Sequence, residues 1–401
     1  MATSHFLKKG HKPTLLSAFV YSDMSFMVWV LLGPLAVHIA RDLKLSGAQQ
    51  YAMVAIPLLA GALLRIPVGA LVDRYGPLRT GLLCQAAVIV ALLTASVGQV
   101  SSVAGLYLLG AALGIAGTSM AVALPLAARW YPDEHQGKAL GIAGAASSGT
   151  VFAALFAPGL AEAYGWRNVL ALAVIPLFLT LLVYLLLAKE RRAPAATQRP
   201  AYARVLAEAD LWWFMLFYAV TFGGVVALAS TLVLYFHEQY RLAPVTAGYF
   251  TAVCVLAGAA LRPVGGWIAD HFGGVKSLHL MFGVAALGVF LVALGPPASF
   301  AAMAFLVFVM AALGMGSGAV FQLVPLRFRQ EVGAATGLIG AAGAFGGFVL
   351  AELLGHSKLA TGDFRVGFMV FAGLTVLSLV GIHKVKSRWR TTWGAVATAR
   401  L

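Results

Sequence analysis

Apolar stretches about as long as a bilayer crossing occupy most of the 401 residues of this chain. A helix needs roughly 20 mostly apolar residues to cross the hydrocarbon core of a membrane. Charged residues and Gly or Pro breaks separate twelve such stretches, which predicts an all-α membrane protein with twelve transmembrane helices. The predicted spans cover residues 15–38, 48–72, 77–98, 102–127, 138–162, 167–188, 211–236, 245–269, 276–295, 299–325, 333–356 and 364–383.

The longest polar segment between spans, residues 189–210, separates span six from span seven. It divides the spans into two equal sets. We therefore predict an N-terminal six-helix bundle over residues 1–188, a linker over 189–210, a C-terminal six-helix bundle over 211–384 and a tail over 385–401.

The composition excludes a soluble enzyme. Charged residues make up only 10% of the chain, whereas about a quarter of the residues of a soluble domain are charged. The net charge of +14 comes from basic residues in short clusters between the spans, so nucleic acid is not an expected partner.

Twenty of the 28 Lys and Arg residues fall on the side that carries both termini, and six fall on the other. By the positive-inside rule we expect both termini and the linker in the cytoplasm, with the bilayer of the cell (inner) membrane around the spans.

No motif for catalysis or metal binding accompanies these spans. The two cysteines, Cys84 and Cys254, lie far apart in separate apolar stretches, and the nine histidines form no HExxH pattern. We expect no catalytic residues, no metal and no cofactor. A polytopic membrane enzyme or sensor remains the alternative from a different class, but the short loops leave no room for a soluble domain.

An internal repeat relates the two halves of the chain. Shifted by 197 residues, AGALLRIPVGALVDRYG from Ala60 aligns without gaps on AGAALRPVGGWIADHFG from Ala257, with eight identities in 17 positions. Arg65 matches Arg262 in this alignment, and Asp73 matches Asp270. At a shift of 196, GKALGIAGAA from Gly137 falls on GAATGLIGAA from Gly333. Spans two and eight, and spans five and eleven, are therefore predicted to be equivalent.

At these residues the chain resembles the major facilitator superfamily. The resemblance covers the whole chain and implies two pseudo-symmetric six-helix bundles that rock about a central site. A GxxxDRxG motif after span two is typical of that family, and a contact at this motif that forms in only one rocked state suits a gate. A plain loop that fixes topology is the alternative. The residues that we assign to the gating motif and its second copy are Gly69, Asp73, Arg74, Gly76, Gly266, Asp270 and Gly273.

Two arginines lie inside predicted spans. Arg65 and Arg262 each precede a motif aspartate by eight residues, which is about 12 Å along a helix at ~1.5 Å per residue. An arginine in the hydrocarbon costs about 2.5–3.5 kcal/mol on insertion scales. Two arginines at symmetry-equivalent positions therefore predict a site for an anionic substrate between the bundles. The alternative is that they bond helix-end carbonyls or pair with Asp23 and hold the bundles together.

Spans five, seven, ten and eleven resemble those of the nitrate/nitrite porter family within the superfamily. The resemblance rests on GAASSGTVFAALFAP from Gly144, YAVTFGG from Tyr218, GMGSGAVFQLVP from Gly314 and GLIGAAGAFGGFVL from Gly337. It implies a transporter of nitrate and nitrite, with the two arginines as an anion clamp. Tyr218 and Phe222 are then the hydroxyl donor and the ring wall of the site.

Small and hydroxyl-bearing residues complete the predicted substrate site. Glycines on spans five and eleven allow close helix packing and a small cavity. The chain departs from the family where asparagine is usual, because it has serines there, and Met120 stands where an aromatic residue is common. A slightly different anion or a larger cavity therefore remains open. The residues added to the site are Ser147, Ser148, Ser317, Gly144, Gly340 and Gly343.

Two acidic residues inside spans bear on the coupling of transport. Asp23 is expected at the membrane interface, and Glu352 is expected at the outer surface. A path without a titratable group favours nitrate/nitrite exchange over proton symport. A carrier of small organic acids and an anion channel are further alternatives. We expect the protein to act as a monomer.

Overall fold

The computed structural model describes residues 10–131, 142–144, 147–191, 202–328 and 331–395. Twelve helical segments in these ranges are long and apolar enough to cross a membrane, which confirms the predicted number of spans. Spans one to six comprise α2 (Lys12–Trp29) with α3 (Leu32–Leu43), α4 (Gly47–Tyr75), α5 (Pro77–Thr94), α6 (Val103–Leu113) with α7 (Ser119–Ala128), α9 (Gly149–Tyr164) and α10 (Trp166–Leu187). Spans seven to twelve are α12 (Ala209–Tyr240), α13 (Pro244–Phe272), α14 (Gly274–Ala293), α15 (Ser299–Arg327), α16 (Val332–Thr361) and α17 (Arg365–Thr391).

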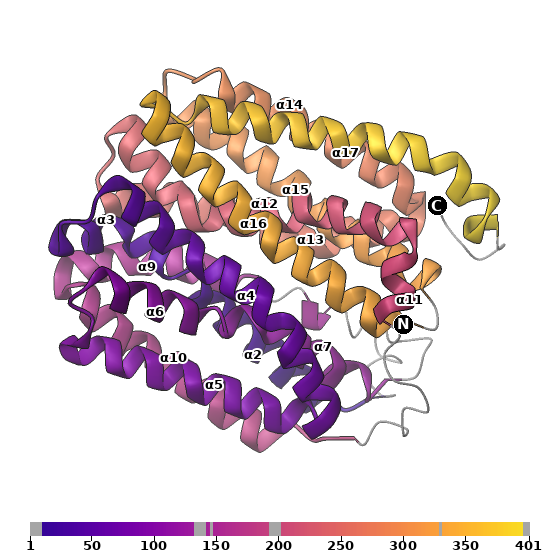
Figure 1. The fold of residues 1–401 in the computed structure, drawn as a ribbon, viewed down its shortest axis with the longest axis horizontal. Helices are drawn as coiled ribbons and strands as arrows, with labels where there is room; N and C mark the ends of the chain where they lie inside the picture. Colours follow the sequence, from indigo (N-terminus) through magenta and orange to yellow (C-terminus); the bar gives the residue numbers. More distant parts are fainter. Residues whose placement is uncertain (1–9, 132–141, 145–146, 192–201, 329–330, 396–401) are drawn as a thin grey trace.

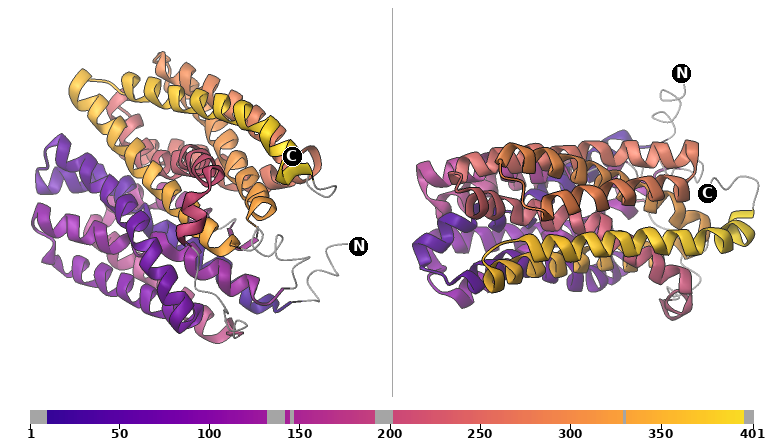
Figure 2. Two further views of the ribbon diagram at one scale, coloured as in Figure 1. Left: turned by 45° about the vertical axis from the view of Figure 1, so that its right-hand side comes forward. Right: turned by 90° about the horizontal axis from the view of Figure 1, so that it is seen from above.

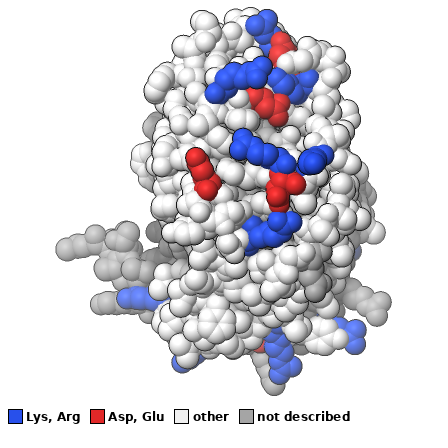
Figure 3. Space-filling view, turned by 90° about the vertical axis from the view of Figure 1, so that its left-hand side faces the viewer, with Lys and Arg blue, Asp and Glu red and all other residues white. Residues whose placement is uncertain are grey.

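The helices form two six-helix bundles that lie side by side. Spans one to six make the first bundle and spans seven to twelve the second, and the start of α2 and the end of α17 lie at the same end of the molecule (Figure 1, Figure 2). We call this the termini end, and the opposite end the far end. Acidic and basic side chains gather on the far end, where Asp42 pairs with Arg167 at 2.7 Å (Figure 3). The far end is therefore suited to contact water outside the membrane.

The last span is longer than predicted. Helix α17 continues to Thr391, eight residues past the predicted end at 383, although its last turns carry several basic residues. Asp210 at the start of α12 explains the extension, because its carboxylate accepts from Arg388 and from the indole N–H of Trp389 at 2.7 Å. Trp389 is buried and stacks on Phe214 with ring centroids 4.8 Å apart. Tertiary contacts between α12 and α17 thus stabilise the end of α17. Hydropathy does not predict this end as helical, because its residues are polar.

The first span is bent where the sequence suggested one continuous helix. Helix α2 ends at Trp29 and α3 begins at Leu32. Beyond the bend, Gly33 lies so close to α12 that an added Cβ would sit 2.1 Å from the carbonyl oxygen of Ser230. The bend therefore brings the far end of span one against the second bundle.

The bundles also touch at the far end through α4. The Tyr51 hydroxyl donates to the Glu238 carboxylate on α12 at 2.9 Å. The Tyr51 ring packs on Gly355 of α16, where an added Cβ would lie 2.6 Å from Cγ of the tyrosine. These contacts hold the far ends of the two bundles together.

The predicted gating motif and its second copy end two equivalent helices. Helices α4 and α13 stop immediately before Gly76 and Gly273, which have φ of +86° and +97°. Only glycine adopts such angles without strain. Gly69 and Gly266 have open space or an ordinary contact where a Cβ would lie. Asp73, Arg74 and Asp270 are exposed at the termini end. A gating role for these residues stays a prediction.

Candidate functional site

The two arginines inside the spans meet at one aromatic ring in the interior. Arg65 on α4 is 4% exposed and Arg262 on α13 is 8% exposed. The guanidinium carbons of Arg65 and Arg262 lie 6.0 Å and 5.4 Å from the centroid of the Phe222 ring on α12. The repeat therefore does bring one arginine from each bundle to the same place.

The partners of these guanidinium groups are neutral. Arg65 donates to the backbone carbonyl of Gly117 at 2.7 Å and to that of Gly340. Arg262 donates to the Tyr218 hydroxyl at 3.0 Å. In the part of the chain that the structure describes, no carboxylate forms an ion pair with either arginine. Both cations thus keep an unbalanced charge in the interior.

Asp23, the acidic residue that the sequence offered as a counter-charge, bonds to other groups. Asp23 on α2 accepts from the Ser148 hydroxyl at 2.8 Å and from the Gly149 backbone N–H at 2.7 Å. Asp23 lies eleven residues into the first span, which runs from Lys12 to Leu43, and it is 4% exposed, so the expectation that it lies at the membrane interface is wrong. Burial is possible because the start of α9 supplies the donors that its carboxylate needs. The alternative in which Asp23 neutralises the arginines is therefore not what the structure shows.

Aromatic side chains fix the geometry around the arginines. The rings of Tyr218 and Phe222 are stacked, 4.9 Å apart and inclined by only 4°. Phe321 meets Tyr218 edge-on at 4.7 Å, and Trp29 stacks on Phe222 at 6.4 Å. Parallel rings one helical turn apart present a flat wall with a hydroxyl at one edge.

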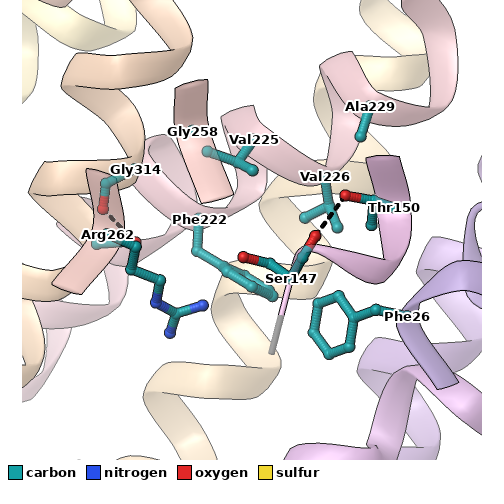
Figure 4. A pocket seen from close by; sticks show the side chains of 11 residues that line it. Phe26, Ser147, Thr150, Phe222, Val225, Val226, Ala229, Gly258, Arg262 and Gly314 are labelled. Atoms are coloured by element: carbon teal, nitrogen blue, oxygen red, sulfur yellow. Dashed lines mark hydrogen bonds between the residues drawn. The ribbon is translucent and has the colours of Figure 1, made fainter. Parts of the chain in front are cut away.

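A small cavity opens beside Phe222 and Arg262 (Figure 4). Its volume of about 10 Å³ is close to the space that one water molecule needs. Most of its walls are apolar, and its polar side chains come from three different helical segments. The lining residues are Phe26, Ser147, Thr150, Phe222, Val225, Val226, Ala229, Gly258, Arg262, Gly314 and Ser317.

The predicted site residues fall into two sets. Phe222, Arg262, Ser147 and Ser317 line the cavity, and Arg65 and Tyr218 contact its lining. Gly340 and Gly343 lie behind them: Gly340 supplies the carbonyl that Arg65 binds, and a Cβ on Gly343 would lie 2.5 Å from Cδ1 of Tyr218. The anion-binding role of all these residues remains a prediction.

Two predicted residues do not reach the cavity. The Ser148 hydroxyl bonds to Asp23 instead. Gly144 has only a Leu124 methyl group near the position of an added Cβ, at 3.7 Å. The direction in which these two residues face depends on contacts with other helices, which their spacing in the sequence does not show.

Several lining residues were missed in the sequence. Phe26 and Thr150 face the cavity, as do three aliphatic residues of α12. Thr150 follows Ser147 by three residues and donates its hydroxyl proton to the Ser147 carbonyl at 2.6 Å. That spacing on one helix face is the single signal that would have pointed to it. The aliphatic residues are indistinguishable in sequence from those that face lipid.

Twelve spans in two bundles, with a buried cationic site at the join between the bundles, define a membrane carrier. The chain matches the sequence profile of the Major Facilitator Superfamily over residues 18–351, and it belongs to that family. Its fold and family are those of transporters rather than of enzymes.

Proteins of similar sequence carry names that refer to nitrogen oxyanions. The chain is 32% identical over 376 residues to the "Probable nitrate/nitrite transporter NarK2" of Mycobacterium tuberculosis, covering 92% of this chain and 95% of that protein. It is 32% identical to the "Nitrite extrusion protein" of Bacillus subtilis, covering 88% and 89%. It is 31% identical to the "Probable nitrate/nitrite antiporter NarK1" of Thermus thermophilus, covering 92% and 90%.

A solved structure has the same fold. It is a bacterial homologue of the human lysosomal transporter Spinster, with a TM-score of 0.73 and 17% identity, covering 93% of this chain and 96% of that one. At this identity the likeness concerns the fold alone.

Proposed function

We propose that this protein carries nitrate and nitrite across the cell membrane by alternating access, with both termini in the cytoplasm. The observation that carries the proposal is the pair of buried guanidinium groups at Phe222, one from each bundle, without a paired carboxylate in the described chain. The names of the similar proteins agree with it. The excess of Lys and Arg on the side of the termini supports the orientation.

The chemistry of the site suits a small planar oxyanion. Nitrate and nitrite have only acceptor oxygens, and the site offers guanidinium and hydroxyl donors. The Nε–H of Arg65 is buried and has no hydrogen-bond partner among the described residues. An unpaired buried donor costs about 1–3 kcal/mol, and an anion bound between the two arginines within reach of this Nε–H removes that cost. The cavity has room for about one water molecule and must widen to admit any anion; a small inorganic anion needs less widening than an organic acid.

The unbalanced charge also suggests how transport is coupled. Two unpaired cations repel each other in an empty site, and a bound anion relieves this repulsion. The loaded carrier therefore rocks more readily than the empty one, which favours exchange. Asp23 is occupied at the start of α9, and Glu352 lies 3.3 Å from His356 near the far end. Neither acid is a free proton site beside the arginines, and the site is complete within one chain.

Vesicle transport tests the exchange. Proteoliposomes loaded with nitrite should take up external nitrate at least about tenfold faster than empty vesicles, because only the loaded carrier returns. Uptake is measured as the initial rate of nitrate entry at matched internal and external pH. Equal uptake into empty vesicles under an imposed pH gradient would favour proton symport instead, and vesicles loaded with sulfate control for charge alone.

The contact between Tyr51 and Glu238 should act as a far-end latch. Tyr51→Phe removes the hydroxyl that bonds Glu238 across the bundles, and a hydrogen bond to a charged group contributes about 1.5–3 kcal/mol. We expect the fraction of molecules with an open far end to rise about tenfold. Spin labels on Ala48→Cys and Ala360→Cys, both exposed at the far end, report the distance between α4 and α16. The exposed Tyr249→Phe is the control, and an unchanged distance distribution in Tyr51→Phe would exclude the latch.

A further inference from the structure

The buried carboxylate of Asp23 has no part in the mechanism above, although it lies in the first bundle close to the cavity-lining segment. It is held at the place where span five changes from a turn to a helix. Ser147 and Ser148 form that turn, and α9 begins at Gly149. The Ser148 side chain makes no capping bond to its own helix. Asp23, from a different helix, supplies the missing cap.

The contacts of Asp23 fix this turn tightly. One carboxylate oxygen accepts from both the Ser148 hydroxyl and the Gly149 N–H. Gly149 also presses on α2, because an added Cβ would lie 1.8 Å from the Asp23 carbonyl oxygen. A carboxylate at a helix N-terminus satisfies backbone N–H groups that otherwise lack partners and interacts favourably with the helix dipole.

The residue next to this cap belongs to the cavity. Ser147 lines it, and Figure 4 shows the Ser147 hydroxyl pointing toward Phe222 and Arg262 while its carbonyl bonds Thr150. Its neighbour Ser148 points to Asp23 instead. Because Asp23 binds the Ser148 hydroxyl, only the Ser147 hydroxyl of this pair of serines faces the cavity.

At the equivalent positions, which the structure describes, the second bundle lacks this capped turn. The residue equivalent to Asp23 at the shift of 197 is Val220, and Gly343 takes the place of Ser147 at the shift of 196. Helix α16 runs unbroken through Gly343 from Val332 to Thr361. The two halves thus treat the same position differently: a capped turn with a hydroxyl in span five, and a bare helix surface behind the aromatic pair in span eleven.

We propose that Asp23 is a positioning residue of the anion site, which holds the Ser147 hydroxyl in the cavity as a donor to the substrate. The proposal rests on the proposed function for the identity of the substrate. Asp23 acts through the backbone of span five and not through its charge, since neither arginine pairs with it in the described chain. Its loss should weaken substrate binding and leave the rocking of the bundles largely intact.

Transport kinetics provide the first test. Asp23→Ala should raise KM for nitrate about tenfold, the effect of one lost hydrogen bond to an anion, with a much smaller change in Vmax. Asp23→Asn keeps an acceptor oxygen and should recover part of the loss. In a Ser147→Ala background, Asp23→Ala should add less than about twofold, because the two residues act in series. Full additivity of the two substitutions, or a fall in Vmax alone, would overturn the proposal. Asp42→Ala, which removes a carboxylate from a far-end ion pair, is the matched control.

Cysteine accessibility gives a second test that does not depend on nitrate. Ser147 is 4% exposed, so a cysteine there is reached only when the bundles part and open the cavity, and the comparison is made on protein that cycles in vesicles. There Ser147→Cys should react with a small anionic thiol reagent that the arginines attract, whereas Ser148→Cys, which faces Asp23 and not the cavity, should react at least about tenfold more slowly while Asp23 is present. Asp23→Ala should abolish this difference. The native Cys84 and Cys254 are buried, and the parent protein gives the background rate. If the parent carries no nitrate but the accessibility pattern holds, the proposed function fails and the positioning role stands. Equal reactivity of the two serine positions in the presence of Asp23 would refute the positioning role.

Discussion

Replacing Arg262 or Arg65 by lysine is expected to reduce nitrate transport by about ten- to hundredfold. Lysine keeps the positive charge but loses the planar fork of donors that matches an oxyanion. Losing one charge-assisted hydrogen bond costs about 1.5–3 kcal/mol, which corresponds to this range. The structure adds a difference between the two variants. Arg65→Lys also loses bonds to the carbonyls of Gly117 and Gly340, whereas Arg262→Lys loses only the bond to Tyr218.

The measurement is nitrate counterflow in proteoliposomes across a range of external nitrate concentrations. Arg262→Lys should mainly raise KM. Arg65→Lys should also lower Vmax, because the Gly340 carbonyl belongs to the other bundle and the bond to it changes as the bundles move. Arg167→Lys, in the far-end pair with Asp42, is the matched control and should transport normally. Wild-type kinetics in both interior variants would remove the basis of the anion site.

Adding one methyl group at Gly343 should be almost as damaging. The Cβ of an alanine there would lie 2.5 Å from Cδ1 of Tyr218 and 2.9 Å from Cδ1 of Phe222. Real Cβ atoms do not approach carbon so closely, so the stacked rings must move. Such overpacking costs about 1–3 kcal/mol. Because Tyr218 also accepts the hydrogen bond of Arg262, we expect Gly343→Ala to lower transport about tenfold or more.

Gly337→Ala is a control on the same helix. Nothing lies within 4 Å of the position of a Cβ at Gly337, so this variant carries the same change in helix propensity without the clash. It should keep normal transport. Retention of wild-type nitrate KM and Vmax by Gly343→Ala would show that the ring stack tolerates displacement and does not shape the site.

Features that depend on local composition were readable from the sequence. The twelve spans follow from hydropathy, because each apolar stretch must be long enough to cross the bilayer whatever its neighbours are. Arg65 and Arg262 were identified because a charge inside a span is costly, and their matching positions in the repeat predicted that they would meet. Their common contact with Phe222 agrees with that prediction.

The misjudged features depend on partners distant in sequence. The sequence predicts an interfacial Asp23, since an isolated carboxylate is costly to bury, but donors at the start of α9 satisfy it in the interior. The basic residues at the end of α17 predict an earlier end for this helix, but Asp210 bonds Arg388 and Trp389 and stabilises the last turns. In both cases the acceptor and its donors belong to different helices.

The sequence by itself therefore determined the number of spans, the duplication and the two interior cations, because these properties follow from hydrophobicity, charge and internal similarity. Only the tertiary structure decided that Ser147 faces the cavity and Ser148 faces Asp23, and that backbone carbonyls of Gly117 and Gly340 hold Arg65. The physical reason is that every residue carries the same backbone carbonyl and N–H groups. Which backbone groups bind a given side chain depends on how the helices pack, and the amino-acid type of a residue does not show this.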